Sequence, residues 1–128
     1  MKINLINGLP VTDIELIYNS HSMLLENVLL DTGCATTIFD TDLVENIGLV
    51  IDPLRGKSVR MFGIGGQSEL CFQQPINRIE IDRFLVENFT LQLGMTSEPY
   101  GFSGILGVDF FIAANLNIDF NMMEVRAT

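Results

Sequence analysis

A carboxylate at the end of a strongly apolar segment is the feature that most constrains this chain. Met23–Leu30 is typical of a strand, and its nearly all-apolar end predicts burial on both faces just before Asp31. Burying an Asp is costly unless hydrogen bonds or a neighbouring group fix or share its charge. Thr32 offers a hydroxyl, and Gly33 lets backbone N–H groups approach closely. The segment therefore predicts a tight loop built around a carboxylate.

The length of 128 residues predicts one domain, 1–128, with a single core. No apolar run reaches the length of about 20 residues that spans a bilayer, because Glu26, Asp31, Asp42 and later charges interrupt each candidate. The first residues lack the long apolar stretch and the cleavage site of a signal peptide. We therefore expect a cytoplasmic protein that does not insert into a membrane.

Charge and cysteine usage exclude several classes of function. A net charge of −9 argues against nucleic-acid binding, which needs a basic face. Cys34 and Cys71 show no metal-binding spacing, and His21 is the single histidine. Zinc sites, Cys-His dyads and Ser-His-Asp triads are therefore not expected. We expect two reduced thiols packed as small hydrophobic groups, no metal and no cofactor.

Short strands separated by turn residues dominate the rest of the pattern, which predicts an all-β fold with one or two short helices. Helix punctuation, with a capping residue before and a Gly or Asn after, marks 40–48 and 108–115. Further strands are expected at Asp13–Tyr18, Thr36–Phe39, Ile76–Ile81, Leu85–Leu93, Ser103–Gly107, Leu116–Phe120 and Met122–Val125, and a hairpin with a glycine-rich tip at Val59–Phe72.

Three features follow one another in an informative order. The loop Asp31-Thr32-Gly33 follows an apolar strand, Gly63-Ile64-Gly65-Gly66 is expected at the tip of a hairpin, and Ile105-Leu106-Gly107 is expected to lead into a short helix. This ordered set resembles the single-domain, retropepsin-like aspartic proteases, over roughly Asp13 to Val125.

The resemblance implies a closed acid-protease barrel with a β-hairpin flap, acting as an endopeptidase on polypeptide substrates without metal or cofactor. Peptide hydrolysis of this kind needs one carboxylate as general base toward water and one as general acid toward the carbonyl oxygen. Two adjacent carboxylates share one proton because they cannot both ionise easily. Since the chain carries one such loop, a homodimer is implied, in which Asp31 of each subunit supplies half of the dyad.

The resemblance also implies roles for the neighbouring residues. The hydroxyl of Thr32 would bond across the dimer axis, and Gly33 would let its backbone reach the carboxylate. The hairpin around Gly63, Ile64, Gly65 and Gly66 would close over an extended peptide. The segment 105–107 would pack beside the active loop.

Two departures from the family pattern stand out. Cys34 occupies a position where the family usually has Ala, Ser or Thr, which predicts weaker support for the carboxylate. Val108 follows Gly107 where retroviral enzymes commonly have Arg, and Thr36 and Thr37 stand near where those enzymes have acidic residues. The charged network that braces the retroviral site is therefore expected to be absent.

Several residues keep a structural alternative. Asp31 could be a turn residue, and the segment 63–66 could be a plain tight hairpin. Asp109 could be a residue of a helix N-terminus or a second catalytic acid. Cys34 could be a packing residue or a site of oxidation.

For the whole chain, a non-catalytic dimeric peptide-binding or scaffolding module and a monomeric β-domain are the alternatives. The terminal segments Lys2–Ile6 and Met122–Val125 are candidates for pairing between subunits.

Overall fold

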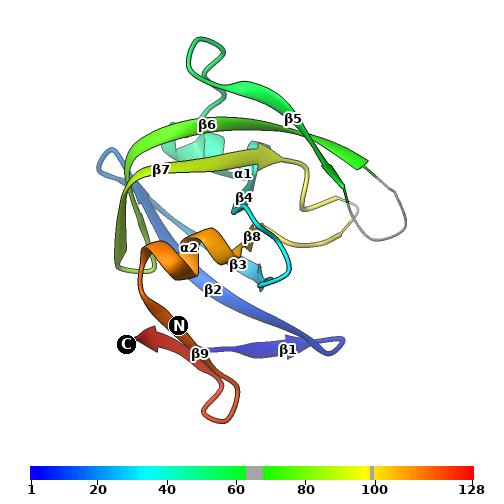
Figure 1. Ribbon diagram of the computed structural model, residues 1–128, viewed down its shortest axis with the longest axis vertical. Helices are drawn as coiled ribbons and strands as arrows, with labels where there is room; N and C mark the ends of the chain where they lie inside the picture. The colour runs from blue at the N-terminus through cyan, green and yellow to red at the C-terminus, as the bar shows by residue number, and fades with distance from the viewer. Residues whose placement is uncertain (63–67, 99) are drawn as a thin grey trace.

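The computed structural model describes residues 1–62, 68–98 and 100–128. These residues fold mainly into strands, with short helices between them (Figure 1). In chain order the elements are β1 (Asn4–Ile6), β2 (Leu9–Tyr18), β3 (His21–Leu30), β4 (Ile38–Asp40), α1 (Thr41–Val44), the 3-10 helix η1 (Glu45–Ile47), β5 (Lys57–Phe62), β6 (Ser68–Ile81), β7 (Phe84–Gly94), β8 (Gly104–Leu106), α2 (Val108–Ala113), β9 (Leu116–Asp119) and β10 (Glu124–Ala127).

The main sheet has the strand order β1-β2-β3-β8-β4-β7-β6-β5, and a further pairing of β2 with β6 joins its two sides. The ring therefore consists, in order, of β2, β3, β8, β4, β7 and β6, and β6 closes it on β2. The predicted all-β closed architecture with short helices is confirmed. Most neighbours are antiparallel, but β3 with β8 and β4 with β7 are parallel. Parallel neighbours require long connections, so the middle of the ring joins segments that are distant in the sequence.

The prediction that separate strands lie before and after Pro75 was wrong, because β6 runs through this residue from Ser68 to Ile81. β5 pairs with β6 only as far as Gln73, and β2 pairs with it only at Glu80 and Ile81. Pro75 lies between these two stretches and is paired on one side, opposite Thr90 of β7. Proline lacks a backbone N–H and therefore fits a strand at a position where no neighbouring strand needs that donor. Pro75 lies at such a position, because neither β5 nor β2 pairs with it.

The predicted hairpin is present, with β5 and β6 paired from Lys57 and Gln73 up to Phe62 and Ser68. The residues proposed for its tip, Gly63, Ile64, Gly65 and Gly66, lie outside the described residues.

The core fills the ring with aliphatic side chains and with buried phenylalanines, which include Phe39 of β4, Phe89 of β7 and two residues of α2. Phe110 is fully buried and packs edge-on against Phe84, with ring centroids 6.5 Å apart, and Phe111 is buried beside it. Both phenylalanines were predicted to be core residues, and both are.

Asp40 ends β4 and caps α1, in agreement with the helix start predicted at this position. One carboxylate oxygen accepts hydrogen bonds from the N–H groups of Asp42 and Leu43, and the other accepts from Thr96 and Ser97. Burial raises the pKa of this carboxyl, but the hydrogen bonds outweigh burial and leave the pKa below its ordinary value. Asp40 therefore ties a helix start to the loop that follows β7.

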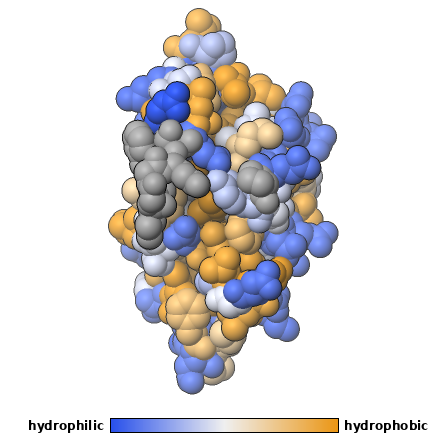
Figure 2. Space-filling view, turned by 90° about the vertical axis from the view of Figure 1, so that its right-hand side faces the viewer, coloured by the Kyte–Doolittle hydropathy of each residue, from blue (hydrophilic) through white to orange (hydrophobic). Residues whose placement is uncertain are grey.

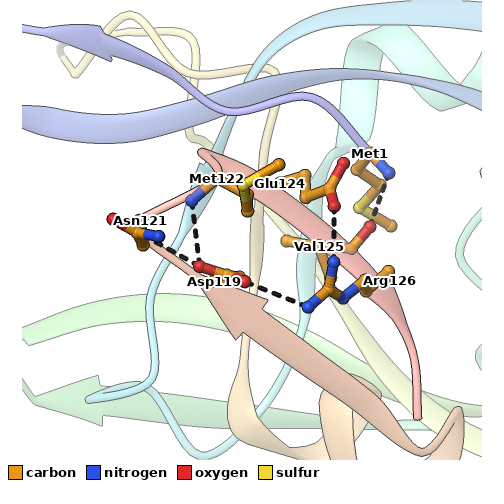
Figure 3. A network of polar contacts seen from close by, with 7 residues as sticks. All are labelled: Met1, Asp119, Asn121, Met122, Glu124, Val125 and Arg126. Atoms are coloured by element: carbon orange, nitrogen blue, oxygen red, sulfur yellow. Dashed lines mark hydrogen bonds and ion pairs between the residues drawn. The ribbon is translucent and has the colours of Figure 1, made fainter.

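The two terminal segments pair with each other within one chain. The Met1 ammonium donates to the Val125 carbonyl at 2.7 Å, and the Val125 N–H donates to the Met1 carbonyl at 2.7 Å (Figure 3). The Ile3 N–H donates to the Met123 carbonyl at 2.9 Å. Ile3 and Val125 are both buried, so the termini belong to the core of a single chain.

No helix among the described residues has the length and apolar character needed to cross a membrane.

Candidate active site

The candidate site forms where β3 and β8 run parallel and end together. Leu30 lies opposite Leu106, and the Asp31 N–H donates to the Leu106 carbonyl at 3.0 Å. Both leucines are buried, as the apolar strand ends predicted. The structure therefore places Asp31 directly after the strand that pairs with Ile105 and Leu106.

The backbone turns tightly around the Asp31 carboxylate. The Gly33 N–H donates to Asp31 Oδ1 at 3.0 Å, and the Cys34 N–H donates to the Asp31 carbonyl at 3.1 Å. A β-carbon at position 33 would lie only 3.2 Å from Asp31 Oδ1, so glycine allows this close approach. Asp31 is half-buried, and its Oδ2 accepts no hydrogen bond from the described residues. One carboxylate oxygen is held by the loop, and the other is free of hydrogen bonds from the described residues.

Gly107 allows two backbone segments to touch. A β-carbon there would lie 2.8 Å from the Cys34 carbonyl oxygen and 2.8 Å from the Thr36 carbonyl carbon. Real β-carbons essentially never approach backbone so closely, so any side chain at 107 would push the segments apart. The next residue, Val108, donates its N–H to the Cys34 carbonyl at 2.8 Å. A backbone hydrogen bond, rather than a charged side chain at position 108, therefore joins the loop after Asp31 to the start of α2.

A second bridge between the two segments was not foreseen from the sequence. The Thr37 hydroxyl donates to Asp109 Oδ1 at 2.8 Å, and the Thr37 N–H donates to Asp109 Oδ2 at 3.1 Å. The same hydroxyl accepts the Gly107 N–H at 3.1 Å, and the Thr37 side chain is fully buried. We call Thr37 and Asp109 the Thr37–Asp109 bridge.

The bridge bears on the two interpretations of Asp109. Asp109 Oδ1 also accepts the Phe110 N–H at 2.8 Å, so both carboxylate oxygens accept hydrogen bonds. These contacts are those of a structural residue at a helix start, and they favour that interpretation over a second catalytic acid. The two partners lie 72 positions apart, so spacing could not reveal the pairing. The one signal in the sequence is that each of the two motifs, 31–33 and 105–107, is followed within a few residues by a polar side chain, Thr37 or Asp109.

Cys34 supports the loop through its backbone, while its thiol points elsewhere. Cys34 Sγ donates to the Thr36 carbonyl at 3.1 Å. Burial raises the pKa of the Cys34 thiol, and the charges of Asp31 and Asp109 raise it further. A protonated thiol reacts slowly with oxidants, which favours the packing interpretation of Cys34. Burial likewise raises the pKa of Cys71.

Two parts of the predicted site remain, Thr32 and the glycine-rich segment 63–66. Thr32 is exposed, and its hydroxyl has no hydrogen-bond partner in the part of the chain that the structure describes. The glycine-rich segment 63–66 lies outside that part. Among residues 1–62, 68–98 and 100–128 no group of His, Cys, Asp and Glu is arranged to hold a metal ion.

Comparison with known proteins finds similarity among solved structures. No protein-family model and no curated protein sequence matches the chain. Among solved structures, the retroviral protease-like domain of Ddi1 from Leishmania major matches with a TM-score of 0.58 and 18% identity, over 91% of this chain and 87% of that chain. A retropepsin-like aspartic protease from Rickettsia conorii matches with a TM-score of 0.60 and 14% identity, over 92% and 82%. The EIAV protease in an inhibitor complex matches with a TM-score of 0.51 and 22% identity, over 81% and 86%. The chain therefore has the fold of the retropepsin-like aspartic proteases, as its sequence motifs predicted.

Proposed function

We propose that this protein is a homodimeric aspartic endopeptidase in which Asp31 of each subunit supplies one carboxylate of a catalytic dyad. The observation that carries the proposal is the geometry of Asp31. Its backbone is tied to Leu106 and Cys34, its Oδ1 is held by Gly33, and its Oδ2 accepts no hydrogen bond from the described residues. A carboxylate held in this way has a fixed orientation and keeps one oxygen that can exchange a proton with water or substrate.

The reaction proposed is hydrolysis of a peptide bond by water. One Asp31 carboxylate takes a proton from water as the water oxygen attacks the peptide carbonyl carbon, and the protonated partner carboxyl donates to the carbonyl oxygen. Collapse of the tetrahedral diol breaks the C–N bond. The carboxyl that took the water proton donates it to the leaving amine, and the partner carboxylate takes a proton from one hydroxyl of the diol, which restores the starting protonation of the pair. No metal or cofactor takes part in this scheme.

The proposal gains support from the fold and from the single Asp-Thr-Gly loop of the sequence. Aspartic proteases are among the structures that share the fold, although the low identities carry the fold alone. The chain has one Asp-Thr-Gly loop, and a two-residue dyad then requires a second copy. In that dimer we assign Thr32 to contacts across the axis and the segment 63–66 to a flap over an extended peptide. A cytoplasmic location remains a prediction from the sequence.

One observation favours a second candidate, a non-catalytic peptide-binding dimer on the same fold. The Cys34 thiol donates to Thr36 and gives no hydrogen bond to the Asp31 carboxylate. Such a module would bind extended peptides by backbone hydrogen bonds without cleaving them.

Peptide cleavage separates the two candidates. A diverse peptide library would be incubated across a range of pH with the wild-type chain, Asp31→Asn and the control Asp42→Asn, which makes the same change at an exposed carboxylate. We expect Asp31→Asn to lose at least about 1000-fold in turnover and Asp42→Asn to retain wild-type turnover. Binding without cleavage by a verified dimer would instead establish the peptide-binding module.

A further inference from the structure

We propose that Gln92 of β7 selects peptides that carry an asparagine or glutamine side chain within a few residues of the bond that is cleaved. The observation that carries this inference is a buried amide oxygen without a partner. Gln92 is 2% exposed, and its Oε1 accepts no hydrogen bond from the described residues. The inference rests on the proposed function and adds the class of peptide side chain that the site accepts.

Gln92 lies on the face of the sheet that points away from the main core. Its neighbours along β7, Leu91 and Leu93, belong to that core, and successive side chains of a strand alternate between the two faces. Ile38, which pairs with Gln92, and Cys71 are also buried, and neither belongs to the main core. A smaller buried region therefore lies on the opposite face, around Gln92.

The strand register connects Gln92 to the active loop. One row of paired residues crosses the sheet on this face, in the order Leu29, Ile105, Ile38, Gln92, Gln73 and Lys57, and we call it the Gln92 row. Leu29 lies two residues before Asp31. Adjacent strands are about 4.8 Å apart, so Gln92 lies about 10 Å from Ile105, roughly the length of three extended residues. A peptide held at Asp31 can therefore reach Gln92.

The Gln92 amide is held at one end and bordered by apolar side chains. Its Nε2 donates to Gln73 Oε1 at 3.4 Å, a long hydrogen bond. A β-carbon on Gly94, two residues further along β7, would lie 2.8 Å from Cys71 Sγ and 3.6 Å from Ile38 Cγ2. These two side chains therefore converge next to Gln92. A buried oxygen without a donor destabilises the folded chain, so a reason for keeping it is expected outside the fold.

Gln74 shows how a structural glutamine is satisfied in this protein. It is 3% exposed, its Oε1 accepts the Asp52 N–H at 2.9 Å, and its Nε2 donates to the Val50 carbonyl at 2.9 Å. The fold uses both ends of the Gln74 amide but one end of the Gln92 amide. Gln92 therefore has the contacts expected of a group that completes its hydrogen bonds with a ligand.

The residues of the Gln92 row favour a neutral donor. The row contains no carboxylate and ends at Lys57, so a lysine or arginine side chain would be buried beside Gln92 without a counter-ion. Ionised aspartate and glutamate have no donor to offer an acceptor oxygen. An asparagine or glutamine amide supplies an N–H to Gln92 Oε1 and keeps its own oxygen for water near the half-exposed Gln73. An apolar side chain would leave Gln92 Oε1 unpartnered in the complex.

The side of the molecule that carries the active loop is largely apolar. The loop after β3 points to the right in Figure 1, and Figure 2 views that side and shows hydrophobic residues over its middle and lower parts. Apolar contacts discriminate weakly between side chains of similar size, whereas a buried polar group rejects a ligand that cannot pair with it. Gln92 is therefore expected to contribute a large share of the selectivity.

Cleavage of a library of random decapeptides, with the cut sites mapped by mass spectrometry, tests the role of Gln92. The wild type is compared with Gln92→Leu and with Asn46→Leu, a control that replaces an exposed amide of η1. We expect the wild type and the control to prefer Asn or Gln over Leu at least about 10-fold at one position. Gln92→Leu should lose this preference and accept Leu or Met at the same position.

Urea denaturation gives a second readout that does not depend on activity. Gln92→Leu removes a buried oxygen that has no donor, so the midpoint should stay unchanged or rise. Gln74→Leu removes an amide that is bonded at both ends, so its midpoint should fall. An equal fall in both variants would mark Gln92 as a structural residue and overturn the proposal. Gln92→Met, with a flexible apolar side chain, decides the matter if Gln92→Leu fails to fold.

The possible failures of the inference and of the proposed protease are distinguishable. A wild type that cleaves peptides without preferring an amide, or a Gln92→Leu variant that keeps the preference, would overturn the role of Gln92 and leave the protease intact. A wild type that cleaves nothing would contradict the protease, and the peptides captured by the immobilised chain would then test Gln92. Enrichment of Asn and Gln among them, lost in Gln92→Leu, would support the role, and captured peptides without it, or no capture, would overturn it.

Discussion

The strands β3 and β4 both have apolar residues just before an aspartate, which follows β3 and ends β4, yet the two carboxylates differ in burial and in the number of hydrogen bonds that they accept. Asp40, after β4, is 3% exposed and accepts hydrogen bonds from four backbone N–H groups. Asp31, after β3, is half-buried and accepts a hydrogen bond from the Gly33 N–H alone among the described residues. The number of donors around a carboxylate therefore distinguishes a structural aspartate from a candidate catalytic one more clearly than its sequence context does.

The largest loss of stability is expected from Asp40→Ala. The change removes the cap of α1 and leaves the buried Thr96 N–H without its partner. We expect the free energy of unfolding to fall by about 2 to 4 kcal/mol, measured by urea denaturation. Asp42→Ala, at an exposed position of the same helix, is the control. Equal losses in both variants would contradict the structural role of Asp40.

Removing the Thr37–Asp109 bridge is expected to have the next largest effect. Thr37→Val keeps the shape of the side chain but removes the hydroxyl that joins Asp109 to the Gly107 N–H. We expect a loss of about 1 to 3 kcal/mol in unfolding free energy, together with lower turnover, because the bridge positions the active loop. Thr37→Ser, which retains the hydroxyl, should recover most of the turnover. A purely structural bridge would lower stability without changing turnover at a temperature where both variants are folded.

Acid should weaken the fold through Asp40. Its pKa is lowered in the folded chain, so the folded state binds fewer protons there than the unfolded chain. The stabilisation is therefore complete above the unfolded value of about 3.8 and is lost as the pH falls through the lower folded value. We expect the unfolding free energy of the wild type to decline more steeply below about pH 4 than that of Asp40→Asn. Parallel curves for the two proteins would show that Asp40 does not cause the decline.

A smaller effect is expected at the surface, where Asp119 offers an intermediate case. Its Oδ1 accepts two backbone N–H groups, as in a cap, but its Oδ2 binds the half-exposed Arg126. Arg126→Met removes the cation and leaves the turn intact. We expect a loss below about 1 kcal/mol by thermal or urea denaturation. A loss as large as that of Asp40→Ala would mean that the ion pair with Arg126, and not the backbone donors, supplies most of the stabilisation by Asp119.

The smallest change in stability is expected from Asp31→Asn, although the loss of turnover expected from this variant is the greatest. An amide oxygen can still accept the Gly33 N–H, and no other described donor is lost. We expect the unfolding free energy of the subunit to change by less than about 0.5 kcal/mol at a fixed protein concentration. A marked loss of stability would class Asp31 with Asp40 as a structural residue.

Local patterns were enough to predict much of the fold. The apolar end of β3, the cap at Asp40 and the left-handed Gly48 that ends η1 each follow from a few neighbouring residues. The strand ends beside Asp31 were also predictable, because the motif order suggested which segments meet. Pro75 misled the prediction of β6, since proline is compatible with a strand only where the sheet leaves its N–H side open, and the sequence does not show this.

Contacts between distant segments could not be predicted in the same way. The Thr37–Asp109 bridge depends on which face of each loop meets the other, and nothing in either local sequence indicates the partner. The direction of the Cys34 thiol depends on the turn geometry that places the Thr36 carbonyl nearby. The pairing of Met1–Ile3 with Met123–Val125 requires the whole ring to bring both termini together.

The parallel pairing of β3 with β8 has a consequence for the order of events during synthesis. Asp31 is synthesised well before the strand β8 that holds it and before Asp109, which lies 72 positions after its partner Thr37. A nascent chain therefore carries the carboxylate long before it can build the site. The topology delays assembly of the site until the segment 104–109 has been synthesised, and it makes the closure of a long loop an expected slow step in refolding.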